Sequence, residues 1–142
     1  MELFRDSYYD KEINEKITQL IGKRFTLWQA IKMNGKGSPR LQIIEATGDI
    51  MNLLSHQSSI NYANIELRIG GIIIRFKARQ DNYALVIPFS KMHIETNDKS
   101  ITFSESGEHI KLSCFAMTEA WPTFLSKLHR FRSEFPDRND AN

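Results

Sequence analysis

A row of basic side chains is the feature of this sequence with the clearest chemistry. Arg75, Lys77 and Arg79 alternate with apolar residues in the run that begins at Ile72. A β-strand sends alternate side chains to opposite faces, so the three cations share one face at spacings of about 7 Å. A phosphate or carboxylate can meet two such cations at once. The row fits a solvated outer face that discourages edge pairing, and its alternative interpretation is an anion-binding face.

Two further cations lie in neighbouring predicted strands. Arg68 precedes the basic row and Lys91 follows it, and we expect both to extend the cationic face. The residues that the sequence predicts as ligand-binding are Arg75, Lys77, Arg79, Arg68 and Lys91.

Residue types used in catalysis and metal binding are present, but their spacing does not build a site. Residues 104–109 bring serine, carboxylate and imidazole together in sequence, which a hairpin turn also explains, because adjacency is not triad geometry. The four histidines lack partners at metal-ligand spacing, and no glycine run matches a phosphate-binding loop. Cys114 is predicted to be a buried structural thiol. We therefore expect no catalytic residue, no metal and no cofactor.

Short strands account for the region from Tyr62 to Cys114. Apolar and polar residues alternate there, and turn residues separate the runs. Connections this short favour an antiparallel meander over parallel crossovers. The strand that ends at Pro88 is apolar on both sides, which predicts burial of both its faces. The predicted strands are 62–69, 72–79, 83–89, 91–96, 100–105 and 109–114, with turns at 70–71, 80–82, 97–99 and 106–107.

An amphipathic helix is predicted from Thr118 to Phe135. Thr118 is its expected N-cap, Pro136 is expected to end it, and residues 137–142 are expected to fray. Trp28 and Trp121 are both predicted to anchor the core. One apolar stripe at helical spacing is expected to cover the sheet: Trp121, Phe124, Leu125, Leu128, Phe131 and Phe135.

The first 60 residues are predicted to form a mainly helical segment. Ile13 to Ile21 form a helical face that Asp10 caps and Gly22 ends. Residues 26–33 fit a short helix or a strand. Residues 41–54 fit a helix, or two strands joined by a turn at 47–49.

Length and composition bound the class of protein. A chain of 142 residues with 41% hydrophobic and 25% charged residues is typical of one globular domain. A net charge of +2 is weak support for a polyanionic partner. The apolar runs are too short for a membrane span, no signal peptide is recognisable, and a lone cysteine suits a reducing compartment. We expect a single soluble cytoplasmic domain, residues 1–142, with no integral membrane association.

Three local features resemble a bacterial pleckstrin-homology-like (PH-like) domain. They are the strand-turn-strand from Gly71 to Ile87, the junction Val-Ile-Pro-Phe-Ser-Lys-Met at 86–92, and the closing helix from Thr118. The resemblance covers residues 62–135 and implies a strongly bent sheet, or partly open barrel, with one end plugged by the helix. It implies a binding or scaffolding module without naming a ligand. In eukaryotic members, a basic pattern near the first hairpin binds phosphoinositides, and the basic row lies at a similar place beside a turn.

The sequence therefore predicts an α+β fold with six or more antiparallel strands, a covering C-terminal amphipathic helix and a partly helical N-terminal segment. The favoured function is a non-catalytic binding or interaction module that recognises an anionic ligand or a protein partner. A small enzyme with a site assembled from distant residues remains an alternative, as does a weak nucleic-acid binder. The sequence also leaves open whether the protein forms a homo-oligomer.

Overall fold

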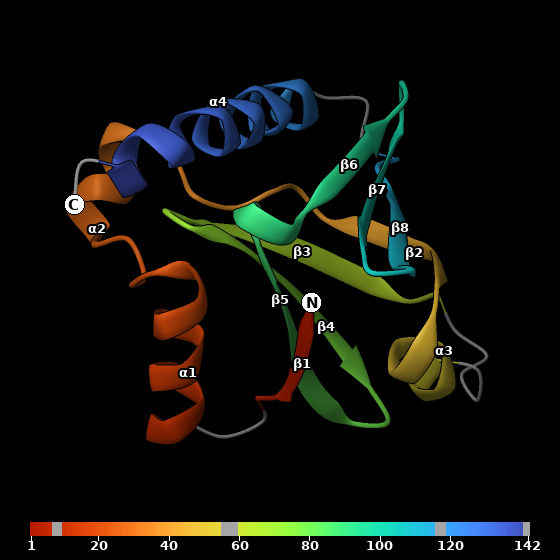
Figure 1. The fold of residues 1–142 in the computed structure, drawn as a ribbon. Coiled ribbons are helices and arrows are strands. Elements are labelled where there is room, and N and C mark those ends of the chain that lie inside the picture. Colours follow the sequence, from red (N-terminus) through yellow and green to blue (C-terminus); the bar gives the residue numbers. More distant parts are fainter. Residues whose placement is uncertain (7–9, 55–59, 116–118, 141–142) are drawn as a thin grey trace.

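The computed structural model describes residues 1–6, 10–54, 60–115 and 119–140, the last five of these by their backbone alone. These residues form an antiparallel sheet of eight strands in the order β1-β5-β4-β3-β2-β8-β7-β6 (Figure 1). The strands are β1 (Glu2–Arg5), β2 (Leu41–Ala46), β3 (Tyr62–Arg68), β4 (Gly71–Ala78), β5 (Asp81–Pro88), β6 (His93–Thr96), β7 (Ser100–Glu105) and β8 (Glu108–Ser113). The helices are α1 (Lys11–Ile21), α2 (Leu27–Lys32), α3 (Gly48–Leu54) and α4 (Ala120–Asp140), and a 3₁₀ turn, η1, spans Phe89–Lys91.

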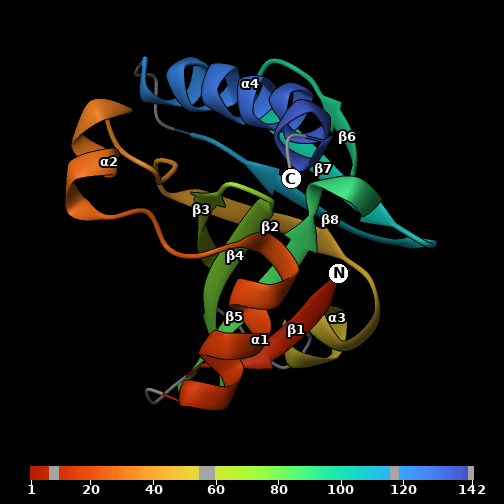
Figure 2. The ribbon, with the colours of Figure 1, turned by 60° about the vertical axis from the view of Figure 1, so that its left-hand side comes forward.

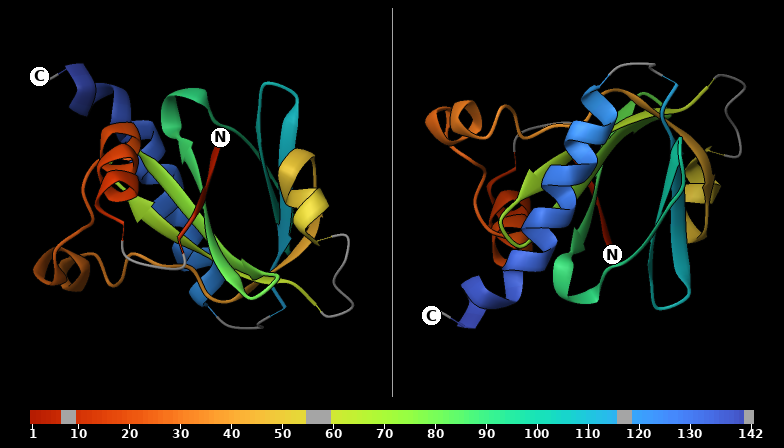
Figure 3. Two further views of the ribbon diagram at one scale, coloured as in Figure 1. Left: turned by 90° about the horizontal axis from the view of Figure 1, so that it is seen from below. Right: turned by 90° about the horizontal axis from the view of Figure 1, so that it is seen from above.

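The predicted α+β class and the six antiparallel strands between residues 62 and 114 are confirmed. They do not form one continuous meander, because β3–β5 and β6–β8 are two three-stranded meanders and β2 lies between them. The sheet is bent but not closed, because β1 and β6 remain its two edges. Seen from above, α4 lies across one end of the curved sheet (Figure 3). Its Trp121, Phe124, Leu128 and Phe131 belong to one buried cluster with residues of the sheet. The sheet residues predicted to receive this stripe all belong to that cluster: Ile74, Phe76, Leu85, Ile87, Phe103 and Leu112.

A second, smaller core lies on the opposite face of the sheet, under α1 (Figure 2). Ile17 and Ile21 of α1 pack with Ile73 of β4 and with Ala84 and Val86 of β5. Both faces of β5 are therefore buried, as its continuous apolar run predicts. The predicted limits of α1 are also confirmed, with an Asp10 side-chain cap at its start and Gly22 at its end.

The hairpin between β4 and β5 has a two-residue turn at 79–80, which starts one residue before the predicted turn. Arg79 and Gln80 have φ of 51° and 70°, and Ala78 pairs with Asp81 across the turn. Two central residues with positive φ define the tight turn whose twist matches antiparallel strands. The predicted turn at 80–82 is therefore wrong, and Arg79 belongs to the turn, outside β4.

The N-terminal segment contains strands as well as helices, so a mainly helical description is incomplete. Residues 41–54 form neither of the two predicted arrangements, because β2 is followed directly by α3. A register shift between Ile43 and Glu45 breaks the alternation of β2, which explains why its strand pattern is hard to recognise. Of the two structures predicted for residues 26–33, the helix is correct, because a Thr26–Gln29 capping box begins α2.

Two further predictions are wrong: the residue at which the C-terminal helix ends and the burial of Trp28. The backbone of α4 continues past Pro136 to Asp140, because an interior proline removes one backbone donor and can kink a helix without ending it. Trp121 is buried as predicted, whereas Trp28 is 65% exposed on a helix that buries none of its residues. The predicted N-cap, Thr118, lies outside the described residues, as do 141–142. None of the described helices combines the length and apolar character needed to cross a membrane.

Candidate anion-binding site

A concave surface lined by several charged and amide side chains lies on the outer face of β3, β4 and β5. A hollow of about 440 Å³ opens there, beyond the part of the face that α1 covers. Strand register brings its polar groups together, because Asn64 pairs with Arg75 and Lys77 pairs with Asn82. The charged and amide side chains that line it are Asp6, Arg40, Asn64, Arg75, Lys77 and Asn82.

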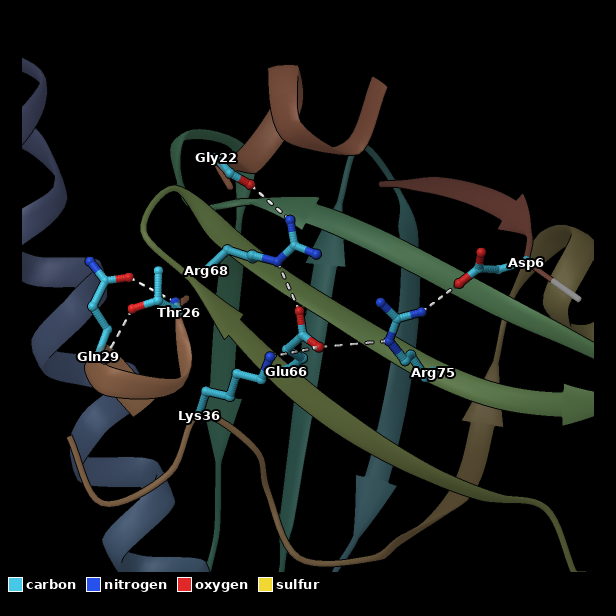
Figure 4. A network of polar contacts seen from close by, with 8 residues as sticks. All are labelled: Asp6, Gly22, Thr26, Gln29, Lys36, Glu66, Arg68 and Arg75. Atoms are coloured by element: carbon cyan, nitrogen blue, oxygen red, sulfur yellow. Dashed lines mark hydrogen bonds and ion pairs between the residues drawn. The ribbon is translucent and has the colours of Figure 1, made fainter. Parts of the chain in front are cut away.

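Arg75 is held in place by carboxylates on two sides (Figure 4). Its Nη1 lies 2.5 Å from Oδ2 of Asp6, and its Nε lies 3.9 Å from Oε1 of Glu66. Asp6 reaches this position because its backbone N–H donates to the carbonyl oxygen of Asn82 at 2.7 Å. The guanidinium therefore stands at the hollow with a fixed orientation, and its charge is partly offset.

Arg68 belongs to a buried network that ties α1 to the sheet (Figure 4). It is only 3% exposed. Its Nε donates to Oε2 of Glu66 at 2.8 Å, and its Nη1 donates to the carbonyl oxygen of Gly22 at 2.9 Å. The Nζ of Lys36 lies 3.9 Å from Oε1 of Glu66. Arg68 is buried in this network and is not among the residues that line the hollow.

Glu66 is the carboxylate on which three of these cations converge. Burial raises its pKa, but the hydrogen bond from Arg68 and the charges of Arg68, Arg75 and Lys36 outweigh burial and hold the pKa below its ordinary value of 4.5. Glu66 is therefore ionised in the folded protein near neutral pH, and it stabilises the cations around it.

The other two cations of the hollow are Lys77 and Arg40. Among the described residues, no carboxylate forms an ion pair with either of them. Lys77 is exposed on β4 and forms no ion pair with any residue that the structure describes. Arg40 is exposed just before β2, and its guanidinium carbon lies 3.9 Å from the centroid of the Tyr62 ring. Stacking of this kind orients the guanidinium without neutralising it.

The remaining two predicted cations lie elsewhere. Arg79 stands in the β4–β5 turn, and its Nη2 donates to the carbonyl oxygen of Asn52 in α3 at 3.1 Å. Lys91 lies in η1 and borders a different hollow together with His93 and Glu105. Of the five predicted residues, the structure therefore brings only Arg75 and Lys77 together in one hollow.

Sequence reasoning missed the other groups of this hollow. Arg40 follows a loop and precedes β2, which the sequence offers only as an alternative to a helix, so no pattern indicates that Arg40 stands over Tyr62. Asp6 follows β1, a strand too short to recognise. The alternation of Asn64 with buried Ala63 and Ile65 could have placed one amide on the cationic face.

The groups with catalytic side chains form ordinary structural contacts. Residues 104–109 include the tight turn between β7 and β8, with Ser106 and Gly107 at positive φ. The Nε2 of His109 lies 2.9 Å from Oε1 of Glu45 on β2. Cys114 is buried in the main core, as predicted. Within the described part of the chain, no group of three or more His, Cys, Asp or Glu could hold a metal ion.

No family model, curated protein or solved structure matches this chain. The resemblance to PH-like domains therefore stays a prediction.

Proposed function

We propose that the protein is a non-catalytic binding module that recognises a phosphate- or carboxylate-bearing ligand in the hollow on β3, β4 and β5. The observation that carries this proposal is the convergence of Arg40, Arg75 and Lys77 on one hollow whose lining includes a single carboxylate, Asp6. Like charges that share a surface repel, and a bound anion relieves that repulsion.

Each cation has a distinct role in this proposal. Arg75 is fixed by Asp6, so its remaining N–H groups are already oriented before an anion arrives, which lowers the entropy lost on binding. Lys77 provides a point charge, and Arg40 provides a planar group with several donors. The amides of Asn64 and Asn82 add neutral donors at the edges of the hollow. This set suits a ligand with several anionic oxygens.

We also propose that this module has PH-like architecture. Three observations support it: two three-stranded meanders, β3–β5 and β6–β8, an unclosed bent sheet, and α4 across one end of that sheet. The strand β2 joins the two meanders into one sheet, because it pairs with both β3 and β8. The segment that holds β1, α1 and α2 would then be an addition to that architecture. A lone, buried cysteine also favours a cytoplasmic location for this module.

The experiment is a binding titration of the full chain and of an Arg40→Gln/Lys77→Gln variant. The probes are inorganic pyrophosphate, a soluble inositol phosphate and a short oligonucleotide, each at low and high salt. We expect at least one probe to bind, with about tenfold or greater loss of affinity in the variant. Binding should also weaken as salt rises, because the screening length falls from about 10 Å at 0.1 M to about 3 Å at 1 M.

A matched control keeps the net charge of the variant but changes cations outside the hollow. Lys91→Gln/Lys99→Gln removes two exposed lysines, and it should bind the same probe as the parent does. An equal loss of affinity in both variants would show that binding depends on net charge alone, and it would contradict the proposal. Failure of the parent to bind any of the three probes would contradict it as well.

A further inference from the structure

The short helix α2 exposes apolar side chains. Leu27, Trp28 and Ile31 are 79%, 65% and 59% exposed, and they occupy positions i, i+1 and i+4 of one helix. Ile31 is three residues after Trp28 and four after Leu27, so it neighbours both on one side of the helix. A large apolar surface in water is unfavourable unless something covers it, and such a surface marks a place of interaction.

The segment that carries α2 is strongly basic. Residues 22–40 contain five lysines and arginines, and they contain no aspartate or glutamate. Two of these cations have contacts inside the protein, since Lys36 lies near Glu66 and Arg40 lies over Tyr62. The other three, Lys23, Arg24 and Lys32, are exposed around α2.

The structure anchors this segment so that its apolar side points outward. The rings of Phe25 and Phe131 lie 5.6 Å apart, which fixes the start of α2 against α4. After α2, the Nζ of Lys127 donates to the carbonyl oxygens of Asn34 and Gly35, at 2.6 and 3.1 Å. Figure 2 shows α2 standing out from the sheet at the side of the molecule. These contacts therefore hold α2 on the rest of the protein while its apolar side faces solvent.

We infer that α2 docks the protein onto the surface of an anionic lipid bilayer. Trp28, Leu27 and Ile31 would enter the boundary between headgroups and acyl chains, where tryptophan is favoured. Lys23, Arg24 and Lys32 would meet the anionic headgroups, and the long lysine side chain can reach them from beside the apolar face. The Nζ of Lys32 already lies 5.3 Å from the centroid of the Trp28 ring.

Charge complementarity favours a bilayer as the occupant. The segment combines an apolar tip with exposed cations and has no carboxylate of its own, which is the pattern that adsorbs to anionic lipid. The inference does not depend on the hollow described above. It uses residues 23–32, which lie ahead of the region that resembles PH-like domains, and it requires adsorption without a membrane-spanning element.

The two tryptophans provide a direct readout. Trp28 is exposed and Trp121 is 5% exposed, so a change of solvent environment on binding should come from Trp28. The full chain is mixed with vesicles of phosphatidylcholine alone or of phosphatidylcholine and phosphatidylglycerol. Sedimentation measures binding, and fluorescence measures the emission shift and the access of iodide. We expect binding to the anionic vesicles, a blue shift and protection from iodide, with little binding to phosphatidylcholine alone.

Two variants test which residues carry the binding. Leu27→Ser/Ile31→Ser removes apolar groups but keeps Trp28 as reporter, and Lys23→Gln/Arg24→Gln/Lys32→Gln removes the charges. Each should reduce vesicle binding by about tenfold or more. All these side chains are exposed, so the thermal midpoint of each variant should stay near that of the parent.

Controls separate this inference from the proposed function. Ile60→Ser/Phe115→Ser removes two exposed apolar groups elsewhere, and Lys77→Gln alters the hollow; both should bind vesicles as the parent does. Absence of binding to anionic vesicles would overturn the inference, as would equal binding to neutral ones. Undiminished binding by the two α2 variants would overturn it too.

Discussion

Arg68 and Glu66 lie two residues apart on β3, and the Nε of Arg68 donates to Oε2 of Glu66 at 2.8 Å although Arg68 is only 3% exposed. Because Arg68 also donates to the carbonyl oxygen of Gly22, this pair connects the end of α1 to the sheet. A cation that the sequence suggests for ligand binding therefore serves the fold, and the anion-binding proposal rests on Arg40, Arg75 and Lys77.

Removal of Arg68 should destabilise the protein strongly. Arg68→Met leaves the carboxylate of Glu66 partly buried without its closest cation, and such a loss costs about 3–5 kcal/mol. The free energy of unfolding in urea measures this. Lys77→Gln, at an exposed position on the neighbouring strand, should change the same free energy by less than about 0.5 kcal/mol. Similar values for the two variants would show that the network does not hold α1 to the sheet.

Glu66 should make stability depend on pH at the acid end. Its pKa in the folded protein is below the ordinary 4.5, so its stabilisation is fully present above about pH 4.5 and is lost as the pH falls through the folded pKa. Glu66→Gln removes this titration. Thermal midpoints between pH 7 and pH 3 should therefore fall less steeply in the variant than in the parent. Parallel curves would show that Glu66 has the same pKa in the folded and unfolded chains.

The contact between α4 and the sheet should be essential to the fold. Phe124 is 2% exposed within the main core, so Phe124→Ala should lower the free energy of unfolding by about 3–5 kcal/mol. Phe115→Ala removes a phenyl ring that is 64% exposed and should cost far less. Chemical denaturation of both variants makes the comparison. A small loss in Phe124→Ala would mean that α4 packs loosely on the sheet.

The site of Gly71 should not tolerate a side chain as small as a methyl group. A Cβ at this position would overlap the backbone of Ile87 and the side chain of Ile21, because α1 and β5 both approach β4 there. Gly71→Ala should therefore destabilise by about 1–3 kcal/mol, as overpacking does. Gly37→Ala is a matched control, since its Cβ would meet only one atom, the Ile65 carbonyl oxygen, at an ordinary 3.8 Å. A loss in the control as large as in Gly71→Ala would contradict this account.

The parts of the fold that local patterns determine could be predicted from the sequence. The strands β3 to β8 alternate clearly and are joined by short turns, and α4 carries a single apolar stripe, so each element is visible within its own residues. By contrast, β1 has only four residues and β2 contains a register shift, so neither shows a usable period.

The candidate site could be predicted only in part, because it depends on contacts between distant segments. The sequence places Arg75 and Lys77 on one face of a strand, which the structure bears out for β4. It does not show that Arg68 is buried against Gly22, or that Arg40 stands over Tyr62. An apolar pattern also does not reveal whether a helix faces the core, which is why Trp28 is misassigned.

Nuclear magnetic resonance of the uniformly ¹⁵N-labelled protein, titrated with inorganic pyrophosphate, tests the anion-binding proposal most directly. The account predicts saturable shifts in the side-chain amides of Asn64 and Asn82 and in the backbone amides near Lys77, and their loss in Arg40→Gln/Lys77→Gln. Shifts centred on Lys91 or spread evenly over the surface lysines, or no saturable shift at all, would contradict it.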